Sequence, residues 1–138
     1  MNKKGFTLVE LLGVIVILSI LVLISIQIIN SIVNKSKKQI KETNIITILD
    51  AAYSWAMDDE LNIALPENEN ESITVTLDTV KKSGHLKKEV INAETGTAYD
   101  DSCIITITKK KYNKSEADTN DTNPNNKYYN NYLFEFGC

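Results

Sequence analysis

The residues with the clearest potential for chemistry lie at the N-terminal end of the chain. A short basic stretch ends at Gly5, and Phe6 begins an apolar run that contains a single acid, Glu10. No further charged residue occurs until Lys35. About 20 apolar residues are enough to cross a bilayer as a helix, and a carboxylate inside such a segment costs at least ~2.5 kcal/mol, so it usually has a function and a partner. Glu10 is therefore a candidate for an ion pair within the membrane.

Two simpler interpretations of this segment are available. An ordinary secretory signal has an apolar core of about 7–15 residues and an A-x-A-like cleavage site, whereas this run is longer and no such site follows it. A plain single-pass anchor would place Lys3 and Lys4 in the cytoplasm and explains the length of the run. It does not explain an acid so close to the cytoplasmic end, and it remains the alternative.

The segment from Lys3 to about Ile29 resembles the class III-type prepilin leader and N-terminal helix of type IV pilins and pseudopilins. The resemblance implies that a membrane peptidase cuts after Gly5 and that the new amine of Phe6 is then methylated. It also implies that Glu10 pairs with the Phe6 amine of a neighbouring subunit. The expected fold class is α+β, with a long N-terminal helix packed on a small antiparallel sheet.

The pattern along the chain supports a single long helix. Neither Gly nor Pro interrupts the sequence between Gly13 and Pro66, and apolar residues recur at spacings of three, four, five and one from Ile40 to Ala56, as on one face of a helix. We predict a helix from about Phe6 to Leu61, with a membrane or assembly half at 6–34 and an amphipathic half at 35–62. Many family members have a helix-breaking Gly and Pro where this chain has Ser19 and Gln27, so the kink found in such filaments is not predicted here.

The remaining residues, 63–138, are expected to form a globular head. A short helix is predicted at 76–84, a strand at 103–108 and a last strand at 128–136, with a long mobile loop at 109–127. Cys103 and Cys138 are the only cysteines and would lie on the exported side, which makes them candidates for one disulfide, although two free thiols remain possible. If they face each other across an antiparallel pair, Ile105 faces Phe136 and Ile107 faces Phe134. In many pilins a disulfide holds the C-terminal region in this way.

Composition excludes several classes of function. The net charge of −3, or −5 without the leader lysines, argues against a general nucleic-acid binder. His85 is the only histidine and is expected to be a solvated turn residue, and the chain has too few Cys and His residues for a zinc site. Asp100-Asp101 and Asp118–Asp121 lack the spacing of a calcium loop. No catalytic residue, metal or cofactor is therefore predicted.

The resemblance implies a structural protein rather than an enzyme. The expected function is a subunit of a type IV pilus, made as a single-pass precursor in the cytoplasmic membrane and assembled into an extracellular fibre. Its partners would be copies of itself and other pilins, the prepilin peptidase and methyltransferase, and the assembly platform in the membrane, with no small-molecule substrate. The alternatives are a pseudopilin of a type II secretion or DNA-uptake system and a membrane-anchored binding domain that never polymerises.

Overall fold

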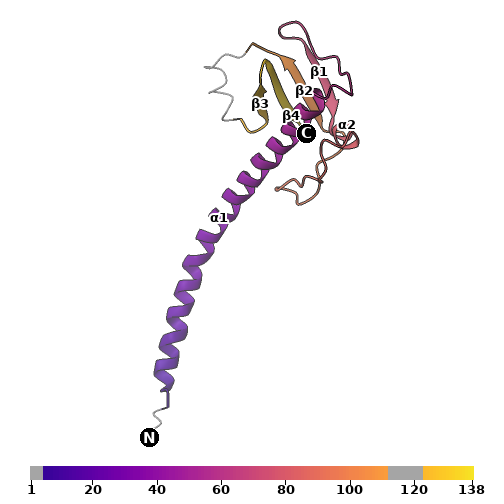
Figure 1. Ribbon diagram of the computed structural model, residues 1–138. Coiled ribbons are helices and arrows are strands. Elements are labelled where there is room, and N and C mark those ends of the chain that lie inside the picture. Colours follow the sequence, from indigo (N-terminus) through magenta and orange to yellow (C-terminus); the bar gives the residue numbers. More distant parts are fainter. Residues whose placement is uncertain (1–4, 112–122) are drawn as a thin grey trace. The chain divides into compact units, whose positions relative to one another are not determined.

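The computed structural model describes residues 5–111 and 123–138. The leader residues 1–4 and most of the predicted loop, including Asp118–Asp121, lie outside the described residues. The elements are α1 (Leu8–Ala56), β1 (Ser72–Thr76), α2 (Leu77–Lys82), β2 (Ile104–Lys109), β3 (Asn126–Tyr129) and β4 (Tyr132–Gly137), as Figure 1 shows. The predicted class, a long helix with a small antiparallel sheet, is confirmed.

The chain divides into two compact units between Lys37 and Lys38. In the first unit, the large apolar side chains of α1 are exposed all along the helix up to Val33, and polar residues follow from Asn34. An 18-residue window of α1 reaches a mean hydropathy of 3.0, so this helix is long and apolar enough to cross a membrane. Ser19 and Ser25 donate their hydroxyls to the carbonyls of Ile15 and Leu21, each at 2.7 Å. These bonds satisfy polar groups that lipid could not.

The predicted C-terminal end of the helix, Leu61, is wrong, because the helix ends five residues earlier, at Ala56. The amide of Met57 still donates to the carbonyl of Tyr53, but Asp58 donates to Trp55, three residues back. The Asp58 carboxylate then accepts the amide of Glu60 at 2.9 Å. A side chain that bonds its own backbone in this way competes with the helix, which ends at Ala56.

In the second unit, the amphipathic part of α1 packs against the sheet. Its apolar stripe is buried from Ile45 to Ala56 and faces the inward residues of the strands, whereas Ile40, predicted as its first member, is exposed. The buried cluster contains Ile45, Ile48, Leu49, Ala52 and Ala56 from α1, Leu77 and Val80 from α2, and Val75, Ile105, Ile107, Phe134 and Phe136 from the strands. The periodicity of 3.6 on the helix and of 2 on the strands accounts for this core.

The sheet has the strand order β1-β2-β4-β3, and every neighbouring pair is antiparallel (Figure 1). The predicted register is confirmed, since Ile105 lies opposite Phe136 and Ile107 lies opposite Phe134. A slip of one residue would turn these four side chains to the other face, so their shared burial fixes the register.

The predicted last strand, 128–136, is instead the greater part of a hairpin. Strand β3 ends at Tyr129 and β4 begins at Tyr132, with Asn130 in the left-handed region at φ +52°. Asparagine tolerates this conformation better than most residues, so Asn130-Asn131 was a turn signal in the sequence. The predicted loop at 109–127 is correspondingly shorter, because Asn126 and Lys127 already belong to β3.

The short helix predicted after Thr76 is confirmed as α2. The Thr76 hydroxyl accepts the amide of Thr79, as an N-cap does. Gly84 follows the helix with φ +82°, a conformation that a residue with a Cβ rarely adopts.

Side chains from α1 also hold the edge strand β3. The Asp50 carboxylate accepts hydrogen bonds from the Tyr129 hydroxyl and from the Lys127 ammonium, the latter at 2.9 Å. The ring of Tyr53 stacks on that of Tyr129 at a centroid distance of 4.4 Å. Burial and the nearby carboxylate raise the pKa of Tyr129 above its ordinary value.

Replacing Phe134 by alanine is expected to lower the free energy of unfolding of the second unit by about 3–5 kcal/mol. Phe134 is fully buried, and its ring contacts Tyr129 and Tyr53 edge-on at centroid distances of 5.2 and 6.0 Å. Trp55, the only tryptophan, packs against this core and can report denaturant unfolding of the full chain in detergent. Ile104→Ala, at an exposed position of the same sheet, is the control. Equal denaturation midpoints for the two variants would contradict the expected role of Phe134.

Candidate functional site: the N-terminal segment and the disulfide

The N-terminal segment places Glu10 in contact with Thr7. The Glu10 carboxylate oxygen Oε2 accepts the Thr7 amide at 2.8 Å and the Thr7 hydroxyl at 2.9 Å. The amide of Glu10 in turn donates to the Thr7 hydroxyl oxygen at 3.3 Å. This reciprocal arrangement is a capping box, in which residues three apart satisfy the free amides at a helix N-terminus. Sequence analysis missed it, although the Thr-x-x-Glu spacing was visible.

The capping box leaves part of the carboxylate free. Within the described residues, the second oxygen of Glu10, Oε1, has no hydrogen-bond partner, and the whole side chain is exposed. The negative charge also lies in the first turn of α1, where it complements the helix dipole. Glu10 is therefore oriented by its own helix and still able to accept a cation from outside it.

The two residues at the expected cleavage point precede the helix. Gly5 and Phe6 are non-helical and exposed, and a Cβ built on Gly5 meets no atom within 4 Å. Among the residues that the structure describes, Gly5 and Phe6 are covered by no side chain, and Thr7 and Glu10 follow them directly.

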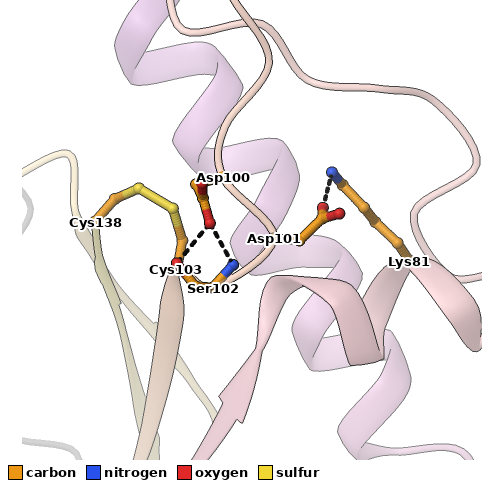
Figure 2. The surroundings of a disulfide bond; sticks show 6 residues. All are labelled: Lys81, Asp100, Asp101, Ser102, Cys103 and Cys138. Atoms are coloured by element: carbon orange, nitrogen blue, oxygen red, sulfur yellow. Dashed lines mark hydrogen bonds and ion pairs between the residues drawn. A yellow bond between two sulfur atoms is a disulfide. The ribbon is translucent and has the colours of Figure 1, made fainter.

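The structure joins Cys103 and Cys138 in a disulfide with a Cα–Cα distance of 4.6 Å (Figure 2). The two residues are 35 positions apart, so the bond links the start of β2 to the end of β4. The carbonyl of Cys103 also accepts the amide of Leu77, the first residue of α2, at 2.8 Å. The disulfide thus lies where α2 and two strands meet.

The turn that leads into Cys103 is held by carboxylates. Asp100 accepts the Ser102 hydroxyl at 2.5 Å and the Ser102 amide at 2.8 Å, and Lys81 reaches Asp101 at 2.6 Å (Figure 2). The Ser102 hydroxyl and amide hold the pKa of Asp100 below its ordinary value. The contribution of Asp100 to stability is therefore present above the unfolded-state pKa and is lost as the pH falls through the lowered folded-state value.

Removal of the disulfide by Cys103→Ser/Cys138→Ser is expected to destabilise the second unit by about 3–4 kcal/mol, because the unfolded chain loses a closed loop of about 36 residues. Denaturant unfolding followed by Trp55 fluorescence in the full chain measures the effect. Reductant should bring the unmodified protein to the midpoint of the double variant and leave the variant unchanged. An unmodified protein that does not respond to reductant would contradict the expected contribution.

The expectation that His85 is a solvated turn residue is wrong. Its side chain is only 19% exposed, with Nε2 3.1 Å from the Asp58 carboxylate and Nδ1 3.0 Å from the Ser83 hydroxyl. The Ser83 hydroxyl also donates to the carbonyl of Val80 at 2.8 Å. The three residues link the end of α1 to the turn after α2.

Metal ligands do not gather in the part of the chain that the structure describes, where no group of three or more His, Cys, Asp or Glu side chains is positioned to hold an ion. The Asp100-Asp101 pair is occupied instead by Ser102 and Lys81. The residues with a recognisable chemical arrangement are those of the N-terminal segment.

Comparison with known families agrees with this geometry. Residues 1–26 match the family model described as the prokaryotic N-terminal methylation motif. This motif is the class III signal of type IV pilins and pseudopilins, and it supports a member of that group. It points to a structural protein, processed by a prepilin peptidase and assembled with other pilins, and together with the apolar helix it fits a membrane-anchored precursor. No curated protein and no solved structure matches the chain.

Proposed function

We propose that this protein is a structural subunit of a type IV pilus, cleaved between Gly5 and Phe6, methylated at Phe6 and assembled into a helical filament. The observation that carries the proposal is the N-terminal segment itself. It combines an open Gly5–Phe6 bond with a carboxylate, Glu10, held at the start of an apolar and exposed helix. The methylation motif covers the same residues.

The exposed apolar side chains of α1 explain why such a subunit polymerises. Outside lipid they must be covered by the same helix of other copies, and lipid itself gives little preference for one neighbour over another. An ion pair between Glu10 and the Phe6 amine of the adjacent subunit supplies that preference. A wrong register leaves the charge unpaired, so the pair selects register more than it adds strength. Contacts that repeat head to tail without closing produce a helical filament.

In this proposal the precursor lies in the cytoplasmic membrane with residues 1–5 on the cytoplasmic side. The prepilin peptidase and methyltransferase act there, and the assembly platform of the pilus then moves the processed subunit into the growing fibre. The second unit, residues 38–138, forms the outer layer of the fibre, and the Cys103–Cys138 disulfide holds its C-terminal strand in the sheet.

The second candidate is a pseudopilin of a type II secretion or DNA-uptake system, which uses the same N-terminal segment in a short fibre within the envelope. The long polar stretch between β2 and β3 favours an exposed fibre surface. A membrane-anchored binding domain that never polymerises has no use for Glu10 so close to Phe6.

The intact mass and the N-terminal peptide of the protein, taken separately from membranes and from sheared surface material, test the proposal. A chain that begins at N-methylated Phe6 in the sheared fraction is expected. The same modified end confined to membranes would favour a pseudopilin, and Met1 retained in cells with an active prepilin peptidase would reject both in favour of an anchored domain.

A further inference from the structure

The C-terminal end of α1 carries an excess of negative charge that the described residues do not balance. A helix C-terminus is the negative end of the helix dipole and is usually accompanied by basic residues. The last turn of α1 contains none, and Asp58, Asp59 and Glu60 follow it directly. We call residues 57–61 the acidic pole, which lies at the start of the loop that joins α1 to β1 (Figure 1).

Most of the carboxylates of this pole have no cation. Asp58 pairs with His85, whereas Asp59 and Glu60 are exposed and form no ion pair with any residue that the structure describes. Met57 and Leu61 flank them with exposed apolar side chains. Acids farther along the same loop, Glu67 to Glu71, lie next to β1, where the backbone of Glu71 pairs with that of Lys109.

A complementary surface occurs earlier on the same helix. Lys35, Lys37, Lys38 and Lys41 follow the apolar segment, and no acid lies between Glu10 and Glu42. We call residues 35–41 the basic pole. Lys41 pairs with Glu94 at 2.9 Å and Lys38 approaches Glu42 only at 4.0 Å, while Lys35 and Lys37 are exposed and have no ion-pair partner in the described chain. Ile40 adds an exposed apolar side chain here as well.

The two poles match in sign and in composition, since each combines unpaired charges of one sign with exposed apolar side chains. They are also separated along α1, by about 27 Å from Lys38 to Ala56 at about 1.5 Å per residue. Surfaces that are complementary but separate on one chain produce heterologous contacts between copies, which extend head to tail. We propose that in the filament the acidic pole of one subunit docks on the basic pole of a second copy of this chain.

This contact rests on the proposed function and adds a second determinant of register to Glu10. An individual exposed ion pair contributes little to the stability of a contact, but several pairs around a shared apolar contact favour one alignment of the two subunits. Alignments that bring like charges together are opposed. Because the contact lies outside the apolar segment, it is exposed to dissolved ions that screen its charges. Sheared fibres are therefore expected to dissociate more readily in high salt.

Charge reversal in the full chain tests the contact. Lys35→Glu/Lys37→Glu and Asp59→Lys/Glu60→Lys are each expected to lower the yield of sheared fibres by roughly tenfold, because each brings like charges together. The two reversals combined should restore most of the yield. Glu67→Lys/Glu69→Lys, which makes the same charge change elsewhere in the loop, is the control. The mass of the membrane fraction verifies that every variant is made and processed.

The outcomes separate this contact from the proposed function. If the wild-type chain forms fibres and both charge reversals give normal fibre yields, the contact is overturned and the proposed function stands. The contact would also be overturned if Lys35→Glu/Lys37→Glu lowered the fibre yield while Asp59→Lys/Glu60→Lys left it normal and did not restore it in the combined variant. That result would assign the lysines to another partner, such as anionic lipid headgroups. Absence of fibres from the wild-type chain would remove the proposed function and the contact together.

Discussion

Cells that express Gly5→Leu as the only copy of this protein are expected to accumulate uncleaved precursor and to produce no fibre. Family resemblance assigns the cut to the bond after Gly5, where the peptidase requires a small residue. In the described part of the chain, a Cβ built on Gly5 meets no atom within 4 Å beyond its sequence neighbours. A block is therefore expected to arise between the new side chain and an external partner. The intact mass of the membrane fraction measures it directly.

A matched control is available in the same helix. Gly13→Leu makes the same chemical change eight residues later, where a Cβ also meets no atom within 4 Å. It is expected to be cleaved normally, because it lies beyond the site at which the peptidase acts. If Gly5→Leu yields a chain of unchanged mature mass, the requirement for a small residue at position 5 is refuted. If both variants remain uncleaved, the added bulk impairs insertion rather than recognition.

The parts of the fold that the sequence predicted are those set by local periodicity. The apolar stripe of α1 and the alternation of Ile105 and Ile107 each specify a face, and burial of that face fixes the register with Phe134 and Phe136. The parts that were wrong depend on single polar side chains. Asp58 ends the helix by bonding the amide of Glu60, and Asn130 adopts a left-handed conformation that divides the last strand. Neither effect alters the hydrophobic pattern on which the prediction relied.

Contacts between distant residues explain the other differences. His85 has an unremarkable sequence environment, and only the fold brings it to Asp58, twenty-seven positions earlier in the chain. The capping box of Thr7 and Glu10 is local and could have been predicted from its spacing. Glu10 therefore has a second role within its own helix, besides the proposed pair between subunits.

That second role changes how substitutions of Glu10 should be designed. Alanine removes both the charge and the acceptor that Thr7 uses, so a defect in Glu10→Ala has two explanations. Glutamine removes the charge but keeps an oxygen able to accept the Thr7 amide, as the capping-box pattern allows either residue at this position. Loss of the cap alone is worth about 0.5–2 kcal/mol at the helix end, and insertion into the membrane is expected to survive it.

Both variants are expected to be cleaved and inserted normally and to be nearly absent from sheared fibres. Glu10→Gln should be almost as defective in fibre assembly as Glu10→Ala. The proposed partner is the positive amine of Phe6, and a neutral glutamine amide cannot compensate the charge of that amine in an apolar core. The amount of mature protein in the sheared fraction, relative to that in the membrane, gives the comparison. Thr7→Val, which removes the hydroxyl but leaves the charge, should retain most of the yield.

The pattern across the three variants identifies the interaction that matters. Normal fibres from Glu10→Gln and few from Glu10→Ala would mean that the capping box, rather than the intersubunit ion pair, is what assembly requires. Normal fibres from both would remove Glu10 from the assembly mechanism, and the free oxygen Oε1 would then have no proposed partner. A defect in Thr7→Val as severe as that of Glu10→Gln would show that the carboxylate must be held by its own helix before it can accept the neighbouring amine.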